Sequence, residues 1–222
     1  MIARPRLLAA TGLAVLAAAA LGGCKSKGEL VVDEGVGVSA VRGTCPAVGI
    51  PDYTGDVTLF RDPASTDANA IDVTAAITNL RPNCAEGGTT EKVYSQTGFD
   101  VLARRTDTRG ARTVQLPYFV TVLRGGTAVI SKRVGTVTLN FADGQERAQA
   151  HAEAGAYIDR AEATLPEDVR RRITRKRKAG EADAAIDPLT VPEVRAAVTR
   201  ATFEVLVGFQ LSEQQLAYNA TR

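Results

Sequence analysis

The sequence predicts a mostly β fold, an antiparallel sandwich of about seven strands with two or three short helices near the C-terminus. Three observations support this prediction. Between residues 57 and 158, apolar side chains recur with the two-residue period of strands, and glycine-containing turns separate the segments. After Pro166 the period changes to that of amphipathic helices. With five tyrosines, six phenylalanines and no tryptophan, the core must consist mainly of Val, Leu, Ile and Ala.

Six segments have the composition or the alternation of strands and are separated by turn signals. They are residues 57–60, 70–80, 97–105, 112–124, 135–141 and 203–211. Turns such as Gly125-Gly126 and Asp143-Gly144 lie between them, which implies a succession of hairpins. Pro117 cannot donate a hydrogen bond to a neighbouring strand, so we expect its strand to lie at an edge or to contain a bulge.

Residues 147–158 fit two interpretations. Small or apolar residues alternate strictly with larger or polar ones, which favours a strand after the Asp143-Gly144 turn. The alternating residues are Ala148, Ala150, Ala152, Ala154, Ala156 and Ile158. The helix propensity of alanine favours the opposite assignment. We predict a strand, which brings the expected number to seven.

Three helical segments are expected near the C-terminus. They are residues 166–179, 192–200 and 212–218. In the first, Pro166 precedes an acidic turn, cations follow, and Gly180 ends the segment, in agreement with the helix dipole and both terminal signals. The second begins with Pro192 and has one apolar stripe. Ser212 and Gln215 form a weak capping box for the third.

The expected number of strands, their alternation and the frequent turns resemble immunoglobulin-like and fibronectin-like sandwiches. The resemblance is architectural. There is no tryptophan to pack on a disulfide, and Cys45 precedes the first clear strand. It therefore implies a fold and no particular function.

The first residues have the layout of a secretory signal. Arg4 and Arg6 precede an uncharged apolar run, residues 7–21, which is shorter than the roughly 20 residues that span a bilayer core. The segment Leu21-Gly22-Gly23-Cys24 then resembles the lipobox of bacterial lipoproteins. This resemblance implies cleavage between Gly23 and Cys24, a diacylglyceryl group on the Cys24 thiol and an acylated new amino terminus. The alternative is an ordinary secretory signal followed by an incidental cysteine.

The lipobox resemblance divides the chain into three parts. Residues 1–23 are the expected signal peptide, residues 24–40 the lipidated cysteine and a tether, and residues 41–222 a single β-rich domain. Several acyl chains on one residue hold a protein stably in a lipid bilayer. Because Lys25 follows the cysteine where inner-membrane lipoproteins have aspartate, the resemblance favours the outer membrane, with the domain facing the periplasm.

Processing would also change the charge and the cysteine count. Cleavage removes Arg4 and Arg6 from 27 basic residues and none of the 25 acidic ones, which leaves 25 of each sign. A neutral chain in the bacterial cell envelope is not expected to bind nucleic acid. Cys45 and Cys84 remain as an even pair in an oxidising compartment, so we predict one disulfide.

The segment RRRITRKRK, residues 170–178, is the strongest local charge. Its cations could bind anionic envelope lipids or lipopolysaccharide phosphates. They are Arg170, Arg171, Arg172, Arg175, Lys176, Arg177 and Lys178. The simpler interpretation is a solvated helix face, because acidic residues flank the segment on both sides.

Few residues indicate catalysis. His151 is the single histidine, and a lone histidine in an alanine-rich segment is usually a surface or packed side chain. The chain has no Gly-x-Ser-x-Gly elbow, His-Glu-x-x-His site, Walker loop or dinucleotide fingerprint, so no cofactor and no metal are expected. Five aspartates could serve a hydrolase or bind calcium, although aspartate is also common in turns. They are Asp52, Asp56, Asp62, Asp67 and Asp72.

These observations favour a membrane-anchored, noncatalytic envelope protein that binds another envelope protein or has a structural role. Two alternatives remain. One is a binder of anionic lipids or lipopolysaccharide through residues 170–178, and the other is a carboxylate-dependent hydrolase.

Overall fold

A computed structural model describes residues 43–86, 88–178, 180–182 and 185–222. All of them lie in one unit of the chain, residues 36–222. The signal peptide, the lipidated Cys24 and the tether predicted for residues 1–40 lie outside the described residues. None of the helices within the described ranges is long and apolar enough to cross a membrane.

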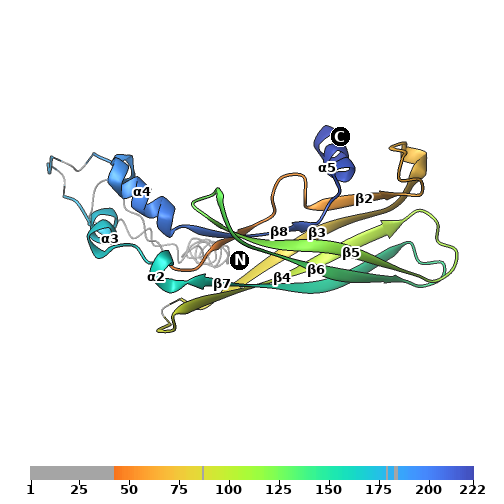
Figure 1. Cartoon of the computed structure of the whole chain (residues 1–222), viewed down its shortest axis with the longest axis horizontal. Helices are drawn as coiled ribbons and strands as arrows, with labels where there is room; N and C mark the ends of the chain where they lie inside the picture. Colours follow the sequence, from red (N-terminus) through yellow and green to blue (C-terminus); the bar gives the residue numbers. More distant parts are fainter. Residues whose placement is uncertain (1–42, 87, 179, 183–184) are drawn as a thin grey trace, which may run out of the picture. The chain divides into compact units, whose positions relative to one another are not determined.

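The described residues form two four-stranded sheets, which confirms the mostly β prediction (Figure 1). The first sheet has the order β1-β8-β5-β6 and the second the order β2-β3-β4-β7. The strands are β1 (Ala47–Gly49), β2 (Asp56–Phe60), β3 (Ile71–Cys84), β4 (Lys92–Arg105), β5 (Arg112–Arg124), β6 (Ala128–Phe141), β7 (Arg147–Asp159) and β8 (Phe203–Phe209).

Strand β1 was not predicted, and it makes the first sheet mixed rather than antiparallel. It pairs in parallel with β8, with Val48 opposite Val205. Three residues are too few to show an alternating pattern. The ambiguous segment 147–158 is a strand, because β7 pairs with β4 along its whole length, from Arg147 opposite Arg104 to Asp159 opposite Lys92.

Of the two alternatives predicted for the strand of Pro117, the bulge is found and the edge is not. Strand β5 is interior, between β8 and β6, and it contains an irregularity that falls between Val122 and Leu123 rather than at the proline. Pro117 lies where the ladder with β8 ends, and its carbonyl accepts a bond from the Gln210 amide at 2.9 Å. The missing N–H therefore costs one bond at the end of a ladder, which an interior strand tolerates.

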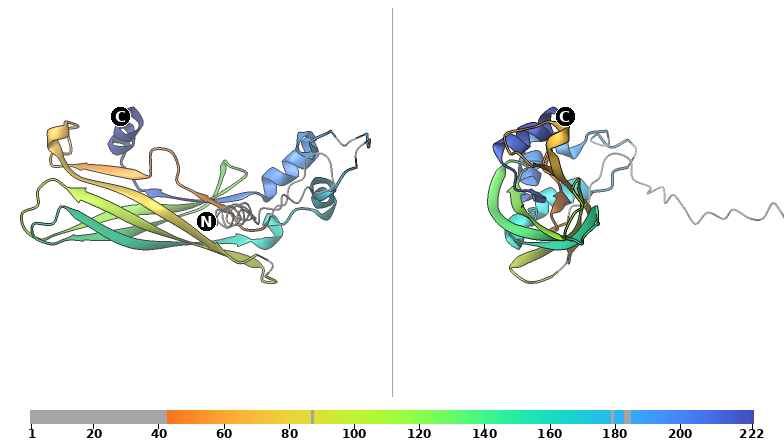
Figure 2. Two further views of the ribbon diagram at one scale, coloured as in Figure 1. Left: turned by 180° about the vertical axis from the view of Figure 1, so that it is seen from behind. Right: turned by 90° about the vertical axis from the view of Figure 1, so that its right-hand side faces the viewer.

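The inner faces of the two sheets share one core, and Figure 2 shows the sheets facing one another. The alternation predicted these faces correctly, because the expected inward residues are buried. Examples are Val73, Phe99 and Val101 from the second sheet and Leu116, Val137 and Leu139 from the first.

Four α-helices and two 3₁₀ turns lie among the described residues. They are η1 (Ala68–Ala70), α2 (Arg160–Ala163), α3 (Glu167–Thr174), η2 (Pro188–Thr190), α4 (Pro192–Ala201) and α5 (Glu213–Thr221). Helices α4 and α5 confirm the helices predicted near residues 192–200 and 212–218. Ser212 and Gln215 form the expected capping box. Ile173 of α3 and Val194 of α4 belong to a small core of their own, separate from that of the sheets.

Helix α3 is shorter than predicted. It ends at Thr174, and Arg175 already has extended backbone angles, φ −62° and ψ 126°. The extended path buries the Arg177 side chain to 5% exposure. Tertiary packing therefore outweighs the favourable dipole interaction that would keep these cations in a last helical turn.

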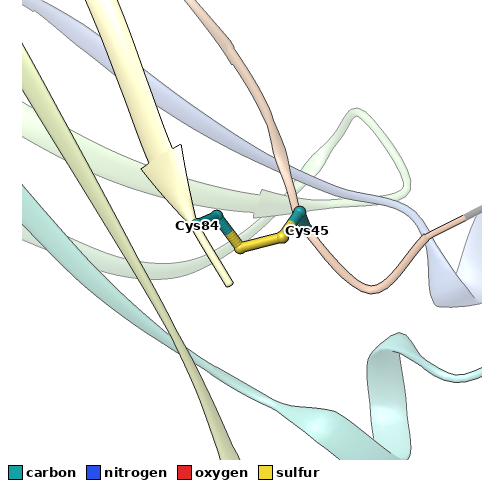
Figure 3. Close-up of a disulfide and its surroundings, with 2 residues drawn as sticks. All are labelled: Cys45 and Cys84. Carbon is teal, nitrogen blue, oxygen red and sulfur yellow. A yellow bond between two sulfur atoms is a disulfide. The ribbon is translucent and has the colours of Figure 1, made fainter. Parts of the chain in front are cut away.

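The predicted disulfide is present between Cys45 and Cys84, whose Cα atoms are 6.0 Å apart (Figure 3). Cys84 is the last residue of β3 in the second sheet, whereas Cys45 precedes β1 of the first. The bond therefore joins the two sheets. In the entropic model, closing a loop of 39 residues restricts the unfolded chain by about 4 kcal/mol.

Candidate functional site

The outer face of the second sheet has exposed side chains in register across β3, β4 and β7. Cross-strand pairing places Asp100 beside both Thr78 and His151, and Tyr94 opposite Tyr157. Because successive strand residues point to opposite faces, these side chains lie on the face turned away from the core. A sheet holds them with little freedom, which is a requirement for a binding surface.

Asp100 is the centre of a polar network on this face. Its carboxylate accepts hydrogen bonds from Asn79 Nδ2 at 2.6 Å and Arg81 Nη2 at 3.2 Å, and His151 Nδ1 lies 2.9 Å away. Only 13% of the Asp100 side chain is exposed. The network thus combines residues of three strands around one carboxylate.

A β-bulge in β3 brings two of these donors to Asp100. The pairing with β4 shifts between Thr78 and Arg81, and Asn79 has a positive φ of 57°. Asparagine tolerates this left-handed conformation better than most residues. The bulge turns the Asn79 and Arg81 side chains toward the same acceptor.

His151 is a half-exposed side chain within the network. Its ring lies over Gly98, where an added Cβ would stand 3.2 Å from Cε1. Its Nε2 lies 4.0 Å from Glu153 Oε1, and Glu153 accepts a hydrogen bond from Gln96 Nε2 at 2.6 Å. The network therefore offers hydrogen-bond donors and acceptors to a partner.

Two tyrosines continue the face beyond Glu153. The rings of Tyr94 and Tyr157 are 4.8 Å apart at an angle of 37°. They are 44% and 61% exposed. Tyr94 lies over Gly155, which leaves no space for a side chain at that position. Exposed, mutually packed tyrosines beside fixed polar groups are typical of protein interfaces.

The cations of the segment 170–178 do not form one face. Arg170 pairs with Glu167 and Arg175 with Glu181. Arg177 is buried and donates a hydrogen bond to the Arg172 carbonyl at 3.3 Å. Among the described residues, the exposed Arg171, Arg172 and Lys178 make no ion pair.

The aspartates of residues 52–72 are dispersed. Asp72 holds Arg112 through two hydrogen bonds of 2.7 and 2.6 Å, and this bonding raises the pKa of Arg112. Asp56 pairs with Arg222, and Asp62 accepts from the Ala64 amide at 3.0 Å. Within the described ranges, no three His, Cys, Asp or Glu side chains gather as metal ligands would.

Sequence reasoning missed most of this face. The alternation in residues 97–105 had already placed Asp100 opposite the apolar residues, which is the signal that could have identified an outward polar row. It could not predict that Asn79, Arg81 and His151 would meet there, because this depends on the order of the strands and on the bulge.

Comparisons with known proteins do not identify the chain. No protein-family model matches it, and no curated protein and no solved structure matches it either.

Proposed function

We propose that this protein is a lipid-anchored module of the bacterial cell envelope, an immunoglobulin-like sandwich that binds another envelope protein without catalysis. The lipobox ending at Cys24 supports the anchor, and Lys25 favours the outer membrane with the domain in the periplasm. The Cys45–Cys84 disulfide suits an oxidising compartment. The two facing sheets are consistent with the immunoglobulin-like and fibronectin-like architectures.

The observation that carries the binding role is the outer face of β3, β4 and β7. It combines the exposed pair Tyr94 and Tyr157 with the ordered network around Asp100. Tyrosine is enriched among the residues that dominate binding energy at interfaces. Because the side chains of this face are already held in place, the face would lose little conformational freedom when a partner binds.

Photo-crosslinking in intact cells tests this proposal. A photoreactive amino acid at Tyr157 should give a discrete adduct with one envelope protein. The matched control is Thr138, an exposed position on β6 of the other sheet, which should give none. Equal adducts from both positions, or none from Tyr157, would contradict the assignment of the partner to this face.

The anchor has a separate test. Cys24→Ser removes the only thiol of the lipobox, so the variant should lack acyl chains and retain its signal peptide. Mass spectrometry of the purified variant measures both. A mature, acylated Cys24→Ser protein would disprove the lipobox and the localisation that follows from it.

A second candidate function is binding of anionic lipid through the segment 170–178. It is favoured because Arg171, Arg172 and Lys178 are exposed and make no ion pair within the described part of the chain. Arg171→Gln with Arg172→Gln should weaken association with vesicles of acidic phospholipid, more at low salt than at high salt. Lys132→Gln with Arg133→Gln, on exposed positions of β6, removes the same charge elsewhere and should have a smaller effect. An equal loss of vesicle association in both variants would contradict a specific role of the segment 170–178, because it would show only a general electrostatic attraction.

A further inference from the structure

We propose that a groove on the outer face of the second sheet, separate from the tyrosine pair, binds a phosphate monoester with an apolar body. The groove has a volume of about 610 Å³. This is within the range of roughly 300–1,000 Å³ typical of small-molecule sites. The proposal does not rest on the binding of a protein partner.

Two neighbouring cross-strand rows form the floor of the groove. One row runs from Thr58 and Thr74 to Arg104 and Arg147, in register across all four strands. Arg222 lies at the β2 end of the groove, where it pairs with Asp56. The floor is therefore a regular part of the sheet rather than a gap between loops.

Arg104 and Arg147 make the site attractive to an anion. They are directly opposite one another on β4 and β7, and like charges at such positions destabilise a sheet. Glu146 pairs with Arg104, whereas Arg147 makes no ion pair among the described residues. An anionic group between the two guanidinium groups would remove the repulsion, and phosphate matches guanidinium through paired hydrogen bonds.

The second row runs from Asp56 through Ala76 and Leu102 to Gln149, and its two middle residues provide an apolar surface beside this charge. Ala76 lies next to Leu102, and the Leu102 side chain is 46% exposed although it is on an interior strand. A ligand with a hydrocarbon or aromatic body would cover Leu102 and remove its surface from water. Inorganic phosphate has no such body, so the two rows together select an organic phosphate.

Calorimetric titration of the full chain in a nonionic detergent tests the proposal, with the heat of titration into protein-free detergent subtracted. The probes are hexyl phosphate, phenyl phosphate and inorganic phosphate. We expect at least one organic phosphate to bind about tenfold more tightly than inorganic phosphate. Tighter binding of hexyl phosphate would indicate a lipid-like ligand, and tighter binding of phenyl phosphate an aromatic one. Equal binding of all three probes would overturn the proposal.

Variants locate the binding. Arg147→Gln removes the cation that makes no ion pair among the described residues, and because the position is exposed the variant should fold. It is expected to lower the affinity for the better probe about tenfold, the effect of losing one charged hydrogen bond. Arg133→Gln on β6 is the matched control and should bind as the wild type. Unchanged binding by Arg147→Gln, or an equal loss in both variants, would overturn the assignment to the groove. Because no partner protein is present, this result is independent of the crosslinking test.

Discussion

The two faces of the second sheet use the same residue type in opposite ways, and the neighbours Arg104 and Arg105 show the difference. Arg104 points outward with 66% of its side chain exposed and pairs with Glu146. Arg105 points inward, is 1% exposed and pairs with no carboxylate among the described residues. One face is therefore a solvated charged surface, whereas the other incorporates a cation into the core.

Backbone carbonyls satisfy the buried Arg105. Its guanidinium donates to the Gln145, Gly110, Thr108 and Ala142 carbonyls at 2.7 to 2.9 Å. The ring of Phe141 lies 5.2 Å from its Cζ. These bonds join the β4–β5 and β6–β7 connections, so the arginine fixes the turns at one end of the sheets. A buried cation can therefore be a structural element when each of its nitrogens has an acceptor.

The largest difference in stability should appear when Arg105 and Arg104 are each replaced by alanine in separate variants. Arg105→Ala removes a side chain that is 1% exposed and leaves four backbone carbonyls without their donor, so it should lower the free energy of unfolding by about 3–5 kcal/mol. Arg104→Ala, on the exposed face, should change it by less than about 0.5 kcal/mol. Urea denaturation of both variants measures the difference. Similar values for the two would show that the inward arginine is not structural.

The disulfide is the next largest contribution to the same core. The double variant Cys45→Ser and Cys84→Ser releases the link between the sheets and should lower the free energy of unfolding by about 2–4 kcal/mol. The wild type unfolded with reductant present should approach the variant, and the variant itself should not respond to reductant. A wild type that is insensitive to reductant would contradict this contribution.

On the outer face, Asp100 should matter more than the residues that bond to it. Asp100→Asn removes the charge that holds Arg81 and His151, and should cost about 1–2 kcal/mol in the free energy of unfolding. His151→Gln removes one half-exposed partner and should cost less than about 0.5 kcal/mol. Thermal unfolding compares the two. A larger loss of stability in His151→Gln than in Asp100→Asn would show that the histidine, and not Asp100, holds the network together.

The smallest effect concerns an exposed turn. Hydrogen bonds from the side chain and the backbone of Arg109 hold the pKa of Asp107 well below its ordinary value. Because the folded pKa is depressed, the resulting stabilisation is complete above the ordinary aspartate pKa and is lost as the pH falls toward the folded pKa. An NMR titration of the Asp107 carboxyl should show the low pKa, and Arg109→Ala should return it toward the ordinary value. An unchanged pKa in the variant would assign the shift to another cause.

Much of the fold could be predicted from local pattern. Strict alternation located the inward face within the predicted parts of the long strands, and it also decided residues 147–158 in favour of a strand against the helix propensity of alanine. Residues 92–96 of β4 and 128–134 of β6 were not predicted. Strand β1 was missed because three residues have no detectable period. The helix predicted over residues 166–179 was too long, because the signals used for its ends are local. The burial of Arg177, which ends α3 at Thr174, depends on tertiary packing.

By itself, the sequence determined which apolar side chains of the predicted strands face the core, where the turns fall and that Cys45 and Cys84 would pair, because period, turn chemistry and an even cysteine count can be read without the fold. Only the tertiary structure decided that Arg105 is buried, that β5 is interior and that Asp100 meets His151. These contacts join strands distant in the chain. The order of strands in a sheet depends on packing of the whole core, and no local segment of the sequence specifies it.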